Sequence, residues 1–133
     1  MEGEGPKAPV PPCYPALTQK GSVMLFSPIR IDDDGTFYVS GQLPSDMTVG
    51  LKEQTASSLA NMDAILSEAG ITRDQIRKMS VFTTQIENIA EVNEAYAAYF
   101  EGVEQLPVRS AFGVTGLVGG ALVEVDCMGK TIR

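Results

Sequence analysis

The chain has 133 residues, enough for one domain with a buried core, and its composition is that of a globular protein. Ten Lys and Arg against seventeen Asp and Glu give a net charge of −7, which argues against nucleic acid and anionic membranes as partners. The chain contains no histidine, which excludes Ser-His and Cys-His dyads and removes the usual ligands of most zinc sites.

The first 15 residues are rich in proline and predict an extended arm, and residues 16–133 are predicted to form a single domain. The opening residues lack the pattern of a secretory signal, and no apolar run reaches the roughly 20 residues that a membrane span needs. Cys13 and Cys127 lie far apart and form no CxxC pair. Reduced thiols and a cytoplasmic location are therefore expected.

A β-hairpin is predicted next. Short apolar runs at 24–26 and 29–31 lead into a turn at 32–35, and a strand-like pattern resumes at 37–39. The turn, Asp32-Asp33-Asp34-Gly35, also permits a calcium-loop interpretation. The remaining EF-hand ligands are absent, so a solvated turn is preferred and no metal site is predicted.

Two amphipathic helices follow, with a strand between them. Residues 52–69 show helical spacing, and Gly70 is suited to a left-handed C-terminal cap. The predicted buried stripe consists of Ala56, Leu59, Ala60, Met62, Ile65, Leu66 and Ala69. Thr72 and Gln75 have capping-box spacing and predict a short helical turn. A strand over 79–84 and a second helix over about 88–100 come next.

Two more strands flank the glycine-rich segment 116–120, which is expected to be a hairpin loop. The order β-β-α-β-α-β-β, with a hairpin at each end, predicts an α+β two-layer sandwich with two helices on one face of a mixed sheet. The other face would have no second layer to cover it. A closed homo-oligomer is therefore expected.

One arginine and one glutamate stand inside the two C-terminal apolar runs, where an unpaired charge is costly. Arg109 is suited to bidentate capture of a carboxylate, or alternatively to an intersubunit salt bridge. Glu124 shares its strand face with Leu122, Asp126 and Met128. It is either an acid–base group that activates water or an ordinary solvated carboxylate.

Several short segments together form a recognisable pattern. They are Phe37-Tyr38-Val39-Ser40-Gly41-Gln42-Leu43-Pro44, Gln54-Thr55, Asn61, Val81-Phe82, Val92-Asn93, Tyr96, Phe100, Pro107-Val108-Arg109-Ser110 and Leu122-Val123-Glu124-Val125. This combination resembles the YjgF/RidA family from about residue 25 to the C-terminus. The resemblance implies a chorismate-mutase-like fold, a homotrimer with pockets between subunits, and no cofactor.

The activity that the resemblance implies is hydrolytic deamination of reactive enamines and imines, such as 2-aminoacrylate, to 2-keto acids and ammonia. Arg109 would hold the carboxylate of a 2-imino or 2-keto acid, and the main-chain carbonyl of Ala111 would receive the substrate nitrogen. Glu124 with Ser40 would manage water and protons. Gly41 permits close approach of a ligand, although Ser40-Gly41 is equally consistent with a plain strand-to-loop transition.

The chain departs from the family pattern at three places. The family's best-characterised deaminases carry a tyrosine before the first hairpin, where this chain has Leu25-Phe26-Ser27-Pro28-Ile29. They often carry a cysteine where this chain has Ala111, and small residues and arginine where it has Thr115-Gly116-Leu117-Val118. Asn93 either borders the cleft and contacts substrate or is a surface residue of the second helix.

Two further functions therefore remain open beside the deaminase. The missing tyrosine favours a chaperone-like trimer that binds small carboxylates without turnover. Endoribonuclease activity, attributed to some relatives, is disfavoured by the acidic charge and the lack of histidine.

Overall fold

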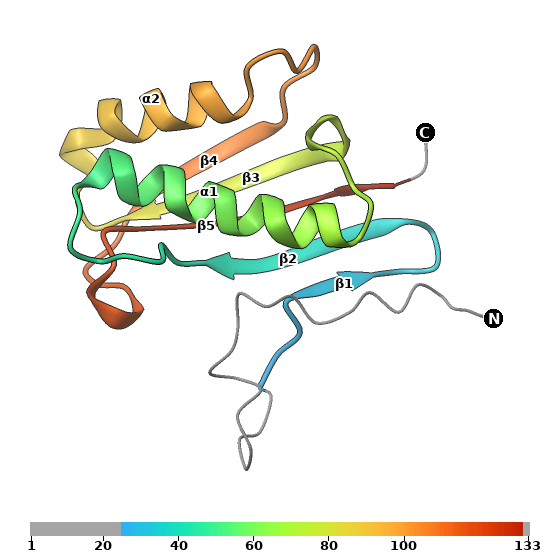
Figure 1. Cartoon of the computed structure of the whole chain (residues 1–133), viewed down its shortest axis with the longest axis horizontal. Helices are drawn as coiled ribbons and strands as arrows, with labels where there is room; N and C mark the ends of the chain where they lie inside the picture. The colour runs from blue at the N-terminus through green and yellow to red at the C-terminus, as the bar shows by residue number, and fades with distance from the viewer. Residues whose placement is uncertain (1–24, 132–133) are drawn as a thin grey trace.

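The computed structural model describes residues 25–131, which form a five-stranded mixed sheet with two helices on one face (Figure 1). The predicted arm, Cys13 and Met24 lie outside the described residues. The elements are β1 (Ile29–Ile31), β2 (Thr36–Gln42), α1 (Leu51–Glu68), β3 (Ile76–Thr83), α2 (Ile89–Tyr99), β4 (Val108–Gly113) and β5 (Val123–Lys130), with short 3-10 turns η2 (Arg73–Gln75), η3 (Ile86–Asn88) and η4 (Val118–Gly120). The predicted α+β class and element order are confirmed.

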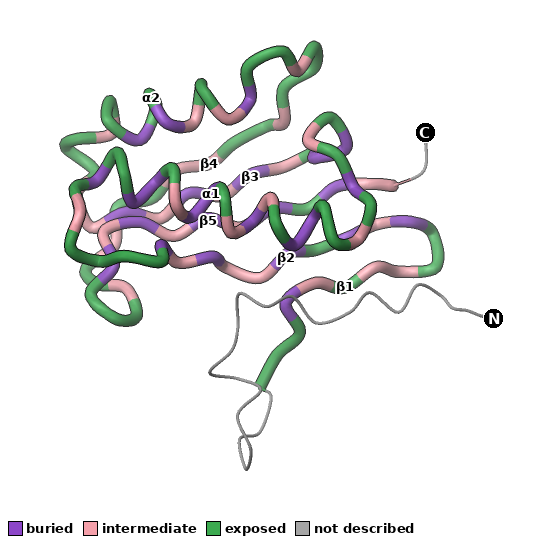
Figure 2. Tube along the Cα trace, in the orientation of Figure 1, coloured by how far each residue is buried: buried purple, intermediate pink, exposed green. Residues whose placement is uncertain are grey.

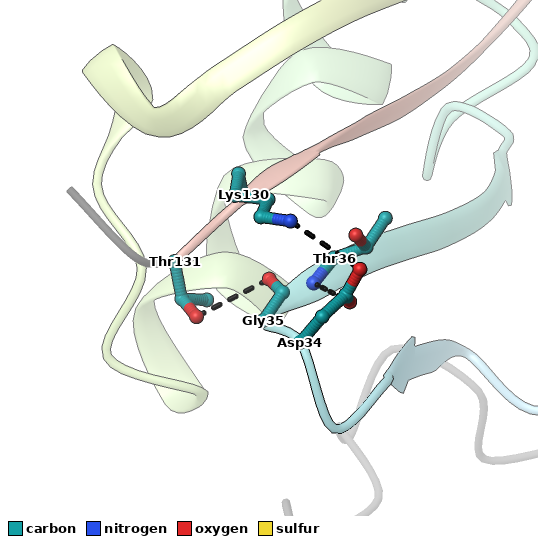
Figure 3. Close-up of polar contacts among 5 residues, drawn as sticks. All are labelled: Asp34, Gly35, Thr36, Lys130 and Thr131. Atoms are coloured by element: carbon teal, nitrogen blue, oxygen red, sulfur yellow. Dashed lines mark hydrogen bonds and ion pairs between the residues drawn. The ribbon is translucent and has the colours of Figure 1, made fainter.

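The N-terminal hairpin is confirmed, with β1 and β2 antiparallel. Its turn is tied to the C-terminal end of β5 (Figure 3). Oδ1 of Asp34 accepts a hydrogen bond of 2.9 Å from the Thr36 amide, and Lys130 Nζ donates to Oδ2 at 3.3 Å. The bond from Thr36 is the main reason why the pKa of Asp34 falls from 3.8 to about 2. This acidic turn is therefore a hydrogen-bonded structural feature.

The strand order is β1-β2-β5-β3-β4, and this corrects the expected C-terminal hairpin. β4 pairs in parallel with β3, through the crossover that contains α2, while β5 pairs antiparallel with both β2 and β3. The glycine-rich segment 116–120 therefore carries the chain past β3 and does not close a two-strand turn. The prediction failed because short connections usually join neighbouring strands, whereas here β5 fills the centre of the sheet and leaves β4 at its edge.

Buried residues alternate with less buried ones along β5, the central strand of the sheet, and Figure 2 colours the chain by this burial. Val123, Val125 and Cys127 are buried beneath the helices, whereas Glu124 and Asp126 are half-buried on the opposite face. The predicted shared face of Glu124 and Asp126 is confirmed. The helices cover only one face, so the other face of the sheet has no layer over it in the described chain (Figure 1).

Helix α1 buries a stripe different from the one predicted. Leu59, Met62, Ile65 and Leu66 are buried as expected, but Ala56 and Ala60 are exposed. Their places on the buried face are taken by three polar residues, Gln54, Thr55 and Ser58. Gln54 explains the shift, because its amide donates to the carbonyls of Met47 and Val49 and accepts from the Leu122 amide. A buried polar side chain satisfied in this way fixes the loop before α1 to the start of β5.

The predicted helix boundaries hold closely. Gly70 has a φ of +75°, as a left-handed cap requires, and the Thr72–Gln75 capping box is present. Strand β3 begins at Ile76, three residues earlier than predicted, because the short turn ends at Gln75 and extended backbone follows at once.

Candidate functional site

Arg109 lies on the edge strand β4, and its side chain extends over α2. Nη1 donates a hydrogen bond of 2.9 Å to Oδ1 of Asn93, and the guanidinium carbon lies 4.8 Å from the centre of the Tyr96 ring. Within residues 25–131 no carboxylate lies at ion-pair distance from this guanidinium. Arg109 is exposed, so its remaining N–H groups are available to an anion.

Glu124 lies on the other face of the sheet. Arg109 is in register with Met79, which is fully buried beneath the helices, whereas Glu124 is in register with Phe82. Phe82 alternates with buried positions and therefore faces away from the helices. The sheet thus separates the two predicted catalytic side chains within one chain.

The Glu124 carboxylate lies directly against the backbone of Gly41. The register between β2 and β5 shifts between Val39 and Gln42, and Gly41 lies in this irregular stretch. A Cβ atom added to Gly41 would lie 2.0 Å from Oε2 of Glu124 and 2.8 Å from its Cδ. Only glycine permits this placement of the carboxylate.

The surroundings of Glu124 raise its pKa, first through burial and then through the negative charge of Asp126. Burial also raises the pKa of Asp126, although a hydrogen bond with Ser80 and the charge of Lys78 oppose the change. A carboxyl group with a raised pKa takes up and releases protons closer to neutral pH than a solvated one. Glu124 is therefore chemically suited to acid–base work.

The hydroxyl proton of Ser40 is already used in a hydrogen bond within the chain. Its Oγ donates to the carbonyl of Ser27 at 2.5 Å, so the oxygen is left as an acceptor. The neighbouring hollow has a volume of about 530 Å³. It is lined by Phe26, Ser27, Arg30, Asp32, Tyr38, Val39 and Ser40.

Ala111 follows Arg109 by two residues and shares its face of β4. The Val114 amide donates to the Thr83 carbonyl on β3. Because successive peptide groups of a strand alternate in direction, counting back from Val114 turns the Ala111 carbonyl away from β3, toward the free edge of the sheet. A ligand held by Arg109 would meet an acceptor there.

Three neighbours of the predicted site residues were missed from the sequence. Tyr96 was noted only as part of the family pattern and was given no role in the site, yet it contacts Arg109. Lys78 and Ser110 lie on the open face, where Nζ approaches Oγ at 3.5 Å beside a hollow of about 220 Å³. Counting back from Phe82 in steps of two places Lys78 on the same face, but the strand was predicted to start after Lys78.

Other reactive or ligating groups do not assemble in the described part of the chain. Burial raises the pKa of the Cys127 thiol to about 12, which keeps it protonated and unreactive. Among residues 25–131 there is no group of three or more Cys, Asp or Glu placed to hold a metal ion. No helix in that range is long and apolar enough to cross a membrane.

The described residues form a two-layer α+β protein with an arginine held by neutral partners at a sheet edge and a half-buried carboxyl of raised pKa on the open face. Residues 19–130 match the family described as Endoribonuclease L-PSP. The chain belongs to this family, the YjgF/RidA family that its sequence motifs indicated.

Individual relatives support the same assignment. The chain is 34% identical over 101 residues to a 2-iminobutanoate/2-iminopropanoate deaminase of Rattus norvegicus, covering 71% of this chain and 72% of the relative. The Rid-family protein YyfA of Yersinia pestis matches with a TM-score of 0.76 and 36% identity, over 83% of this chain and 90% of that one. The structure of E. coli TdcF with bound serine matches with a TM-score of 0.75 and 26% identity, over 84% and 92%.

Proposed function

We propose that the protein hydrolyses reactive enamines and imines of the 2-aminoacrylate type to 2-keto acids and ammonia. The observation that carries the proposal is Arg109, a permanent cation with neutral partners and no carboxylate at ion-pair distance among residues 25–131. A cation left uncompensated in this way is ready to take the carboxylate of a substrate. The rat relative named as an imine deaminase supports the same reaction class.

The pocket is proposed to be shared between subunits of a homotrimer. Arg109 and Glu124 of one protomer lie on opposite faces of the sheet, so a small substrate that uses both would draw them from two copies. The open face supports such packing, since it carries exposed large side chains at Tyr38, Phe112 and Met128. Native mass spectrometry of the full chain should give a trimer; a monomer would contradict this part of the proposal.

The reaction needs positioning and proton transfer but no oxidant. A proton from solvent added to C3 of the enamine gives the 2-imino acid in its protonated, iminium form. Water then bonds to C2 as the C=N electron pair moves to nitrogen, and Glu124 in its carboxylate form takes the water proton. The C2–N bond next breaks with its electrons on nitrogen, which receives that proton from Glu124 and leaves as ammonia. The C2 hydroxyl oxygen forms the C=O bond and releases its proton to solvent, which balances the proton added to C3. Arg109 holds the carboxylate, the Ala111 carbonyl orients the nitrogen, and Ser40 accepts a hydrogen bond from water.

The test couples a serine or threonine dehydratase to a 2-keto acid readout, with and without the protein. The wild-type chain should accelerate keto-acid release, and Arg109→Ala should abolish the acceleration. Arg77→Ala serves as the matched control, because Arg77 is also an exposed strand arginine but lies away from α2. An unchanged release rate at saturating wild-type protein would eliminate the deaminase proposal.

A second candidate is a small-carboxylate binding protein without turnover. It is favoured by Ser40, whose proton is committed to Ser27, and by the absence of a tyrosine among the residues just before β1. TdcF, crystallised with bound serine, is a relative that holds a small amino acid. Binding of 2-ketobutyrate that requires Arg109, together with a silent coupled assay, would select this function. A cytoplasmic location remains a prediction under either function.

A further inference from the structure

Tyr96 and Asn93 surround the guanidinium of Arg109 from α2, and both are electrically neutral. The Tyr96 ring centre lies 4.8 Å from the guanidinium carbon, within range of a cation–π interaction. Asn93 accepts from Nη1 at 2.9 Å through an amide oxygen. Neither contact cancels the positive charge, but each restricts the orientation of the planar group.

The Tyr96 ring is itself fixed by the core. It packs on Phe100, whose ring centre is 4.8 Å away and which is only 3% exposed. Phe100 in turn meets the edge of Tyr99, whose hydroxyl donates to Asp63 on α1 at 2.7 Å. This series of contacts makes the ring a rigid support and not a freely rotating surface side chain.

Helix α2 has two acidic side chains, Glu91 and Glu94, and neither forms an ion pair with Arg109. Glu94, next to Asn93 in the sequence, pairs with Lys52 of α1 at 3.1 Å. That pair is exposed, so its contribution to stability is small. Helix α2 therefore presents to Arg109 the Asn93 amide and the Tyr96 ring, and no carboxylate.

We propose that Tyr96 and Asn93 are positioning residues that hold Arg109 in the orientation that receives the substrate carboxylate. They act through Arg109 and need not touch substrate, which revises the substrate-binding role predicted for Asn93. A cation held by neutral groups loses less side-chain entropy when it binds an anion, and it gives up no competing ion pair. This assignment deepens the proposed function and depends on it for its ligand, a short 2-keto or 2-imino acid.

The first measurement uses the free protein and needs no activity. In the NMR spectrum of the Arg109 guanidinium, the ring current of Tyr96 should displace the Nε–H proton resonance. Tyr96→Leu should remove this displacement, whereas Tyr96→Phe should retain it because the aromatic face remains. An Arg109 resonance that is unchanged in Tyr96→Leu would overturn the assignment, whatever the protein catalyses.

The second measurement is the affinity for 2-ketobutyrate, with circular dichroism to verify folding. Tyr96→Leu should weaken binding about fivefold, in line with a partly exposed cation–π contact, and Tyr96→Phe should restore it. In the coupled assay the loss should appear mainly in KM and much less in kcat, which a general folding defect would not produce. Equal losses for Leu and Phe would contradict a role for the ring face.

The role of Asn93 is tested by replacing its neutral amide with a charged carboxylate. Asn93→Asp keeps the shape but places a carboxylate on Arg109, so 2-ketobutyrate binding should fall more than tenfold. Asn93→Ala should cost only a few-fold, and Asn88→Ala, at the start of the same helix, is its control. Unimpaired binding in Asn93→Asp would overturn the role of neutral partners. If the wild-type protein binds no keto acid while the NMR results hold, the proposed function fails and the orientation of Arg109 by α2 stands.

Discussion

The two proposed halves of the site use opposite physical strategies. Arg109 is exposed, keeps its charge at any working pH, and is oriented by the neutral groups of α2. Glu124 is half-buried, lies against a glycine, and has its pKa raised by burial and by Asp126. An anchor therefore needs a constant charge and a fixed direction, whereas a proton-transfer group needs a charge that is easily lost.

The largest effects are expected from disabling Arg109 and Glu124 separately. Glu124→Gln should lower kcat about 100-fold, the size typical of a lost acid–base group, with little change in KM. Arg109→Lys should mainly raise KM, because a single ammonium cannot reproduce the bidentate contact. Steady-state kinetics with the dehydratase-coupled assay measures both. If both variants changed KM and kcat in the same proportion, the division of roles would be wrong.

A smaller loss of activity is expected when the Glu124 carboxylate is displaced but not removed. In Gly41→Ala the new Cβ would overlap Oε2 of Glu124, so the flexible side chain must turn away. We expect about tenfold lower kcat, because acid–base catalysis depends on the position of the carboxylate. Thermal unfolding should change little, since the displaced atoms are the end of one side chain.

Gly129 provides the matched control on the neighbouring strand. Its Cβ would meet the backbone oxygen of Gln75 at 2.1 Å and the Phe37 ring at 2.6 Å, neither of which can move easily. Gly129→Ala should therefore destabilise the fold by about 3 kcal/mol, at the upper end of overpacking costs. A Gly41→Ala protein that unfolded like Gly129→Ala would show that Gly41 is structural.

The smallest expected effect is a shift in the pH dependence of activity in Asp126→Asn. Asp126→Asn removes the negative charge that helps to raise the pKa of Glu124. If Glu124 acts as a base, activity rises with pH through its pKa, so the acidic limb of the kcat/KM profile should move to lower pH. An unchanged or upward-shifted limb would mean that another group controls the profile.

The same variant carries a prediction for stability, with the sign set by linkage. A carboxyl whose pKa is raised in the folded state binds its proton more tightly there than in the unfolded chain. The free energy of unfolding therefore falls as pH rises through that pKa. Asp126→Asn has no such ionisation. Its unfolding temperature should exceed that of the wild type at neutral pH, and the difference should shrink in acid below pH 3.8, the ordinary value for Asp.

The predicted elements were right where local chemistry decides the backbone. The Thr72–Gln75 capping box, the left-handed Gly70 and the alternation around Glu124 all depend on residues within a few positions of each other. The buried stripe of α1 was wrong at Ala56 and Ala60. There the outcome depends on Gln54, whose hydrogen-bond partners include Leu122, 68 residues away.

Local propensity, periodicity and short motifs were enough to predict the α+β class, the order of elements, the family and the residues worth testing. The folded structure was needed to show that β5 lies between β2 and β3, that β4 is an edge, and that Arg109 and Glu124 face opposite sides. It also decided that Arg109 meets Tyr96 and Asn93. Strand order and side-chain partners come from pairings between distant segments, whose free energies no short stretch of sequence contains.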